Sequence, residues 1–374
     1  MAKKRCDGEG TISQRKSDGR WIGQMTVPGS NGKRISVSAK TQGECKSKLD
    51  KIKLQFQTNT YVPPTNTTYV DYLNTTWLPQ KEKLEKLKIS TIETHKSRIK
   101  LYIEPYFKKT ELQDVTIQML NSFYTTLTDR ISGHTIHKVH AIINNSFKFA
   151  VRDGLVSINP ATNALLPKFT VEPKKSLSSE EIKLLLKSAK EYQNLPNTKT
   201  KNVYPLIALA INTGMRRGEL AALQFYDLNF KDNSITIRHS LMEVKSKGCV
   251  LDTTKTESSQ RTIYISSQMM DILKEHHKDF ATGCYVFPSL TNKNKPMHPS
   301  NINRFFYRVL EIGKLDSSFH IMRHSHITQL LESGVNIKTI KDRAGHSQLS
   351  TTMGYLHPDK KLDKEAASIF EQYM

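Results

Sequence analysis

The sequence has few of the features that mark secreted, membrane or metal-binding proteins. Four cysteines are present, at Cys6, Cys45, Cys249 and Cys284. They lack the paired spacing of a zinc site or a disulfide framework, which indicates a reducing compartment. The start, Met1-Ala2-Lys3-Lys4-Arg5, is followed by no apolar stretch, so we expect no secretion signal. The best apolar run, Tyr204–Ile211, is far too short to span a bilayer, and we expect a cytoplasmic protein with no membrane partner.

Acidic residues are scarce relative to basic ones. The 374 residues include 56 Lys and Arg against 35 Asp and Glu, a formal net charge of +21. Hydrophobic residues make up 37% of the chain, which is enough for packed cores, so disorder does not explain the charge. A basic excess spread from Lys3 to Lys364 suits a polyanion such as nucleic acid. A generally basic protein with no such partner is the alternative. The length indicates two or three domains.

Residues 1–60 are predicted to form a small domain of strands and one helix. The stretch Thr11–Arg15 leads into a hairpin turn signal at Asp18-Gly19, and two further stretches, Trp21–Val27 and Arg34–Ser38, alternate between apolar and polar residues. A helical pattern follows over Glu44–Gln57. We expect a three-stranded sheet with one helix, whose basic strands are suited to lie on DNA, although a solvated basic surface is an equal alternative.

Residues 69–165 are predicted to form a helical domain. A linker rich in Thr, Asn and Pro precedes it, and a second linker follows at Pro167–Lys175. Apolar residues recur three or four positions apart in four stretches: Tyr69–Leu78, Ser90–Ile103, Thr116–Leu127 and His134–Asp153.

Residues 176–374 are predicted to form a domain of helices with one small sheet. A helix is expected to begin after Ser178 or Ser179, and another, from Val203, to stop at Gly214. Helices return from Pro299 to the end of the chain. Strand-like stretches occur at Ser234–Arg238, Cys249–Thr253 and Arg261–Ile265. The fold class expected for the whole chain is mainly α with small antiparallel sheets (α+β).

The last of these domains contains residue types suited to a phosphodiester. Because Gly214 ends one helix, Arg216 lies near the start of the next, where the helix favours an anion. A guanidinium can form a bidentate pair of hydrogen bonds with two non-bridging oxygens of a phosphate. Glu219, one turn further on, is placed to hold Arg216 in its rotamer. A surface Arg–Glu pair is the alternative for this pair taken alone.

His320 and Arg323 are three residues apart on a predicted helix, so both project from one face. They supply a second guanidinium and a proton-transfer group at one place. The four-residue spacing of His320 and His324 also suits a zinc ion. However, the adjacent Glu of the common peptidase motif and an obvious third ligand are both missing, which disfavours a metal site.

Lys255 lies between two strand-like stretches, in a predicted hairpin from which a lysine can reach a phosphodiester and protonate a leaving oxygen. Lys245 and Lys247 are nearby competitors, and an ordinary surface lysine is the alternative. Tyr355 has an ordinary pKa near ~10. It becomes a nucleophile only where cations stabilise the phenolate and the transition state, and otherwise it is a packing residue.

Taken together and in this order, these residues resemble the tyrosine recombinase (phage integrase) family. The resemblance rests on Arg216, Lys255, His320-x-x-Arg323, Gly345-His346 and Tyr355. It covers residues 176–374, and the spacing from His346 to Tyr355 and the run Ser350-Thr351-Thr352 are also similar to the family. One position departs from it: Ala344 stands where the family usually has leucine, which affects packing more than chemistry.

The resemblance implies a chemical role for each residue. Tyr355 attacks the phosphate and leaves a 3′-phosphotyrosine and a free 5′ hydroxyl, with Lys255 as general acid toward the 5′ oxygen. The charge on phosphorus is stabilised by Arg216 and Arg323.

Two histidines complete the implied set: His320 assists proton transfer, and His346 hydrogen-bonds the phosphate. A hydroxyl from the partner strand then reverses the chemistry. Because the bond energy is kept in the phosphotyrosine, the resemblance implies no cofactor, neither ATP nor metal. The sequence has no G-x-x-x-x-G-K-[ST] loop, in agreement.

The resemblance also implies partners. The helical domain is similar to the core-binding (SAM-like) domain of the family, and residues 1–60 to an arm-type DNA-binding domain. They imply an integrase of a mobile element (a prophage or a conjugative transposon), associated with the bacterial nucleoid. Its partners would be double-stranded DNA with core-type and arm-type sites, three further copies in a homotetramer, and excisionase and DNA-bending factors.

The end of the chain carries an apolar stripe at helical spacing, formed by Leu362, Ala366, Ile369, Phe370 and Tyr373. It suits packing on its own domain and, equally, docking on a neighbouring protomer. Rival functions are a type IB topoisomerase, a non-catalytic DNA-binding regulator and a metal-dependent nuclease or transposase.

Overall fold

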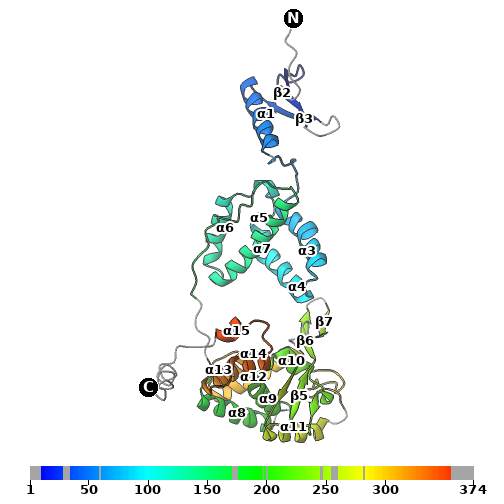
Figure 1. The fold of residues 1–374 in the computed structure, drawn as a ribbon, viewed down its shortest axis with the longest axis vertical. Coiled ribbons are helices and arrows are strands. Elements are labelled where there is room, and N and C mark those ends of the chain that lie inside the picture. Colours follow the sequence, from blue (N-terminus) through cyan, green and yellow to red (C-terminus); the bar gives the residue numbers. More distant parts are fainter. Residues whose placement is uncertain are drawn as a thin grey trace, which may run out of the picture. The chain divides into compact units, whose positions relative to one another are not determined.

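The computed structural model describes residues 10–27, 34–58, 60–170, 176–196, 198, 201–244, 247–253, 260–280 and 283–354. Neighbouring Cα atoms divide the chain into two compact units, Met1–Thr170 and Val171–Met374 (Figure 1). This boundary falls inside the linker predicted at Pro167–Lys175, and the further division of the first unit into two domains stays a prediction. Among the described residues, no helix is both long and apolar enough to cross a membrane.

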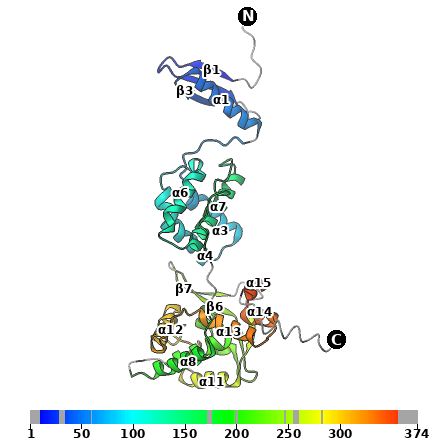
Figure 2. The ribbon, with the colours of Figure 1, turned by 90° about the vertical axis from the view of Figure 1, so that its left-hand side faces the viewer.

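The chain begins with a three-stranded antiparallel sheet and a helix. The sheet has the order β1-β2-β3, and its elements are β1 (Thr11–Gln14), β2 (Trp21–Thr26), β3 (Arg34–Ala39) and α1 (Gln42–Gln57). The side chain of Thr41 caps α1 by accepting from the backbone N–H of Glu44. Figure 2 shows α1 lying along the sheet, against which its residues Cys45 and Leu49 are buried. The predicted three strands and one helix are confirmed.

The rest of the first unit is helical. Two of its helices contain a π-helical segment: α2 (Tyr69–Asp71) continues through Tyr72–Trp77 into α3 (Leu78–Glu85), and α4 (Ile89–Arg98) through Ile99–Ile103 into α5 (Glu104–Phe107). A short 3-10 turn (Leu112–Asp114), α6 (Ile117–Thr128) and α7 (Gly133–Arg152) follow.

The core of these helices is rich in aromatic side chains. The rings of Tyr69 and Phe147 stack with centroids 4.8 Å apart, and Trp77 is fully buried. The hydroxyl groups of Tyr69 and Tyr72 bond to Ser146 of α7, which satisfies their polar ends inside the core. The four predicted helical stretches all form helices, and two of them run further than predicted.

The strands described in the second unit form two small sheets rather than the single sheet predicted. The strands are β4 (Leu228–Asn229), β5 (Ser234–Ile237), β6 (His239–Val244), β7 (Gly248–Thr253) and β8 (Arg261–Tyr264). One sheet has the order β4-β5-β8, and β6 pairs with β7 in the other. The hairpin predicted around Lys255 is therefore wrong, because the strands on either side of it belong to different sheets. The strand β6 was not predicted; it begins just after β5 ends and pairs with β7.

Helices make up most of the second unit: α8 (Ser179–Asn194), α9 (Val203–Thr213), α10 (Arg217–Ala222), a 3-10 turn (Phe225–Asp227), α11 (Ser267–Phe280), α12 (Pro299–Gly313), α13 (Ile321–Glu332), α14 (Ile337–Ala344) and α15 (Leu349–Met353). Ser178 caps α8 in a capping box with Glu181, as the sequence predicts. The helix α9 is buried along almost its whole length and packs against α8, α11 and α13. The mainly helical α+β fold class is confirmed for the described residues.

Candidate active site

Arg216 precedes α10 and is held by the first turn of that helix. The carboxylate of Glu219 accepts the backbone N–H of Arg216 at 2.8 Å and its Nη1 at 2.9 Å. A third bond joins Nη2 of Arg216 to the carbonyl oxygen of Gly345, at 3.1 Å. The Arg216 side chain remains 42% exposed, so its guanidinium is oriented from the protein side and open to an incoming anion. The predicted contact between Glu219 and Arg216 is confirmed.

Glu219 is shared with a second arginine, Arg261, at the start of β8. The Nη1 and Nη2 atoms of Arg261 lie 3.2 and 2.9 Å from the two carboxylate oxygens, in a fork. Burial alone raises the pKa of the Glu219 carboxyl, but the charges of Arg261 and Arg216 and their hydrogen bonds outweigh it and lower the pKa to about 2. This buried carboxylate is therefore ionised throughout the physiological range.

Arg323 joins two distant parts of the chain through their backbone. Its side chain is on α13 and only 2% of the residue is exposed. Nη1 donates to the carbonyl oxygen of Gly214 at 2.8 Å, and Nη2 to that of Ala344 at 2.6 Å. Because Gly214 ends α9 and Ala344 ends α14, these bonds bring the segment before Arg216 and the segment before His346 together.

Two glycines with positive φ make these turns possible. Gly214 has φ +63°, and a Cβ on it would lie 2.8 Å from the ring of His326. Gly345 has φ +66°, and a Cβ there would lie 2.8 Å from Nη1 of Arg261. Both positions exclude larger residues, by backbone conformation and by space.

His346 follows Gly345 and is 7% exposed. Its Nδ1 lies 2.9 Å from the hydroxyl oxygen of Thr352 on α15, a residue that is fully buried. This bond fixes the orientation of the ring. The turn from α14 to α15 therefore supplies a histidine next to the carbonyl oxygen that orients Arg216.

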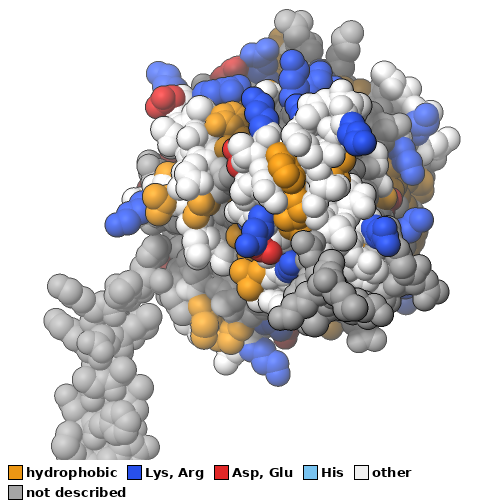
Figure 3. All heavy atoms as spheres, turned by 90° about the horizontal axis from the view of Figure 1, so that it is seen from above, with side chains coloured by type: hydrophobic (Ala, Val, Ile, Leu, Met, Phe, Trp, Pro, Cys, Tyr) orange, Lys and Arg blue, Asp and Glu red, His pale blue; other side chains and the backbone are white. Residues whose placement is uncertain are grey.

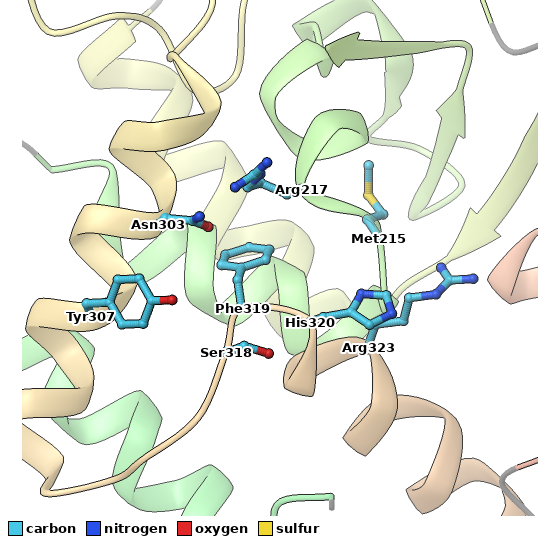
Figure 4. A pocket seen from close by; sticks show the side chains of 8 residues that line it. All are labelled: Met215, Arg217, Asn303, Tyr307, Ser318, Phe319, His320 and Arg323. Atoms are coloured by element: carbon cyan, nitrogen blue, oxygen red, sulfur yellow. The ribbon is translucent and has the colours of Figure 1, made fainter. Parts of the chain in front are cut away.

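His320 immediately precedes α13 and lines a pocket of about 310 Å³ together with Arg323. The remaining lining residues are Met215, Arg217, Asn303, Tyr307, Ser318 and Phe319. Figure 4 shows His320 beside Arg323, and the side chain of Arg217 extending toward Asn303 on α12. The rings of His320 and His324 meet edge to face, with centroids 4.5 Å apart. Within the described ranges, no group of three or more His, Cys, Asp or Glu side chains could hold a metal ion.

His326 is a buried histidine that was not among the residues predicted from the sequence. Its Nδ1 donates to the carbonyl oxygen of Ile211 at 3.0 Å, and its Nε2 accepts from Nε of Arg343 at 3.1 Å. Burial lowers the pKa of His326 to about 4, and the charge of Arg343 adds to the effect. The same Arg343 donates to the carbonyl oxygens of Tyr264 and Asn212.

We expect His326 to make the second unit acid-sensitive. Its folded pKa lies below the unfolded value near ~6.5, so its contribution to stability is complete above that pH and is lost as the pH falls toward the folded pKa. The loss between pH ~6.5 and ~5 is on the order of 2 kcal/mol of unfolding free energy. Urea unfolding across this range should show a shallower pH dependence for His326→Gln than for wild type. Equal slopes would contradict the assignment.

Two of the predicted site residues, Lys255 and Tyr355, lie outside the described residues, as does the apolar stripe from Leu362 to Tyr373. Arg216, Arg323, His320 and His346 are brought together by contacts between α9, α10, α13 and α14. The sequence reading missed Arg261. The available signal was its place in the strand pattern, because Arg261 lies on the same face of the predicted strand as the apolar residue Ile263.

Comparison with known proteins identifies the family of the chain. The model of the phage integrase family matches residues 175–361, which is half of the chain. The model of the phage integrase N-terminal SAM-like domain matches residues 68–128. The integrase of Staphylococcus phage L54a is 27% identical over 329 residues, covering 79% of this chain and 90% of that protein. The ICEBs1 integrase of Bacillus subtilis is 25% identical, covering 72% of this chain and 74% of that one.

Solved structures share the fold. The Tn1549 transposon integrase, in complex with a circular intermediate DNA, has a TM-score of 0.70 at 20% identity, covering 82% of this chain and all of that one. A lambda integrase dimer bound to a COC′ core site has a TM-score of 0.58 at 17% identity, covering 96% of this chain and 99% of that one. On the family match to half of its length, the chain belongs to the phage integrase family of tyrosine recombinases, and it is a site-specific DNA recombinase.

Proposed function

We propose that this recombinase integrates and excises a mobile element, a prophage or a conjugative transposon, by cutting and rejoining DNA through Tyr355. The observation that carries the proposal is the convergence of Arg216, Arg323 and His346. Three bonds to main-chain oxygens at the turns after α9 and α14 hold these residues together. Two guanidinium groups and a fixed imidazole in one place suit the charge that develops on a phosphodiester during transfer.

The proposed reaction balances without an outside energy source. The Tyr355 hydroxyl gives its proton to His320 and attacks phosphorus, which forms the tyrosine O–P bond as the bond from phosphorus to the 5′ oxygen breaks. Lys255 gives a proton to that oxygen, leaving a 5′ hydroxyl, and Arg216 and Arg323 neutralise the added charge. His320 assists the proton transfers, and His346 hydrogen-bonds the phosphate. A 5′ hydroxyl of the partner strand then attacks the phosphotyrosine and releases the enzyme.

Double-stranded DNA is the proposed substrate, at core-type sites and, through residues 1–60, at arm-type sites. The formal charge of +21 supports a polyanionic partner. On the face shown in Figure 3, Lys and Arg side chains are widely spread and few Asp or Glu side chains appear among them. Several relatives are integrases of phages and of other mobile elements, which supports the proposed biological setting.

The proposal extends to assembly and location. Exchange between two duplexes breaks four strands, and each chain carries one Tyr355, so we propose a homotetramer on DNA. Excisionase and DNA-bending factors would set the direction of the reaction, and the site of action would be the nucleoid in the bacterial cytoplasm.

A nicked suicide substrate tests the chemistry. The nick makes the released 5′ end diffuse away, so the cut strand cannot be resealed. With EDTA present, we expect a protein–DNA adduct that survives denaturation and a new 5′ hydroxyl that polynucleotide kinase can label. Failure to form an adduct on DNA that the protein demonstrably binds would contradict the proposal and favour a regulator or a metal-dependent enzyme.

The same preparation separates recombination from topoisomerase activity. A plasmid that carries both ends of the element should give recombinant circles, whereas a plasmid without these sites should not be relaxed. Relaxation without any dependence on the sites would favour a type IB topoisomerase.

A further inference from the structure

Arg261 is a charged side chain on the inner face of a sheet. In the β5–β8 pairing it lies opposite Ile237, and the next pair on the same face joins Ile263 to Ile235, both buried. Alternation along a strand places Thr262 and Tyr264 on the other, exposed face. The Arg261 side chain is only 6% exposed, so it is packed where the strand pattern calls for an apolar residue.

The three donor nitrogens of Arg261 all have partners beside the candidate active site. Nη1 and Nη2 donate to the carboxylate of Glu219, and Nε donates to the carbonyl oxygen of Arg343 at 2.8 Å. Its guanidinium also fills the space next to Gly345. Arg261 therefore touches both groups that orient the Arg216 guanidinium, since Glu219 and Gly345 are the partners of Arg216 as well.

The charges of this cluster decide what Arg216 can offer a phosphate. Glu219 carries one negative charge, and Arg216 and Arg261 carry one positive charge each, so the three groups sum to one positive charge. With Arg261 removed the sum is zero, and the buried carboxylate would be compensated by Arg216 alone. An incoming phosphate would then meet a guanidinium whose charge is neutralised by Glu219 and whose partners, Glu219 and Gly345, are no longer held in place by Arg261.

We propose that Arg261 is a positioning residue for the strand-cleavage reaction. It compensates the charge of Glu219 and clamps the turn at Gly345, so that the guanidinium of Arg216 stays charged and aligned toward the scissile phosphate. This inference rests on the proposed function and adds a residue to it.

The experiment compares two DNA substrates for each protein. One carries an ordinary scissile phosphate, and in the other a methylphosphonate replaces it, so that a methyl group takes the place of a charged oxygen. The neutral substrate depends less on the charge and alignment of Arg216. The measured quantity is the ratio of the adduct-formation rates on the two substrates, phosphate over methylphosphonate. Both rates scale with the amount of active protein, so the ratio does not depend on the fraction that is folded.

Arg261→Met is the principal variant, and Arg238→Met is its matched control. Arg238 follows β5, on the opposite face of the same sheet, and it is also paired with a buried carboxylate, that of Asp227. Each variant removes the arginine partner of a buried carboxylate. Of the two carboxylates, Glu219 also binds Arg216 and Asp227 serves as the control. Should the Arg261→Met chain fail to fold, Arg261→Lys, which keeps the charge and loses the fork, replaces it.

We expect the ratio to fall about 30-fold in Arg261→Met and about fivefold in Arg261→Lys, and to stay unchanged in Arg238→Met. An unchanged ratio in the folded Arg261 variant, or an equal fall in the Arg238 control, would overturn the inference. Wild type and Tyr355→Phe are run on the same DNA. The absence of an adduct with wild type would count against the proposed function itself, whereas a wild-type adduct with an unchanged Arg261 ratio counts only against the positioning role.

Discussion

Replacement of Tyr355 by phenylalanine is expected to abolish the covalent adduct with nicked DNA while leaving DNA binding close to that of wild type. Phenylalanine keeps the ring and loses only the hydroxyl oxygen, which is the proposed nucleophile. Loss of a nucleophile typically costs about 10⁴-fold or more, because the remaining groups of a site cannot replace it. Adduct formation is measured on denaturing gels in EDTA, and binding by gel shift of the intact site.

The control for this loss is Tyr226→Phe. Tyr226 belongs to the same unit, is 60% exposed and meets Arg238 rather than the candidate site. We expect this variant to form the adduct at the wild-type rate. An adduct that persists in Tyr355→Phe would show that another residue attacks the phosphate, and peptide mapping of the labelled adduct would identify it.

Arg323→Met and Arg216→Met are expected to lose cleavage to a similar extent and stability to very different extents. Each removes one guanidinium from the charge that develops on phosphorus, a loss of about 10²- to 10³-fold in rate. Arg323, at 2% exposure, also satisfies the buried carbonyl oxygens of Gly214 and Ala344. Leaving both without a donor should cost about 3 kcal/mol of unfolding free energy.

Arg216 has a smaller structural part. Its side chain is 42% exposed, and Glu219 keeps Arg261 as a partner when Arg216 is replaced. We expect a loss below about 1 kcal/mol for Arg216→Met. Urea unfolding followed by circular dichroism measures both changes in unfolding free energy. Adduct formation is measured without urea, at a temperature where both variants are folded. A stable Arg323→Met chain would refute the joining role that we assign to its two carbonyl contacts.

Local signals in the sequence predicted the positions where helices start and stop. Ser178 and Glu181 form the capping box of α8, and Gly214 ends α9 just before Arg216. These features depend on residues a few positions apart, so the sequence alone contains them. The contact of Arg216 with Glu219 was predictable for the same reason.

Contacts between distant segments were not predictable in this way. The bonds from Arg323 to Gly214 and Ala344 join residues whose closeness depends on how α9, α13 and α14 pack. Arg261 was missed because its inward orientation becomes meaningful only once its pairing with β5 is known. The wrong hairpin around Lys255 has the same origin: strand patterns do not say which strands pair, and β6 provided a nearer partner for β7.

The bonds that hold the candidate site together have an evolutionary consequence. Arg216, Arg323 and Arg261 reach the oxygens of Gly345, Ala344 and Arg343, all of which are main-chain atoms. Every amino acid offers the same oxygen, so the side chain at position 344 can change without loss of the contact, whereas Gly345 is required by its backbone conformation and Arg343 makes side-chain bonds of its own. Ala344, in place of the leucine usual in the family, illustrates this freedom, because only its packing against Ile327 and Ile340 changes with the side chain. The contact between Arg323 and Ala344 therefore depends on the path of the main chain and not on the side chain that position 344 carries.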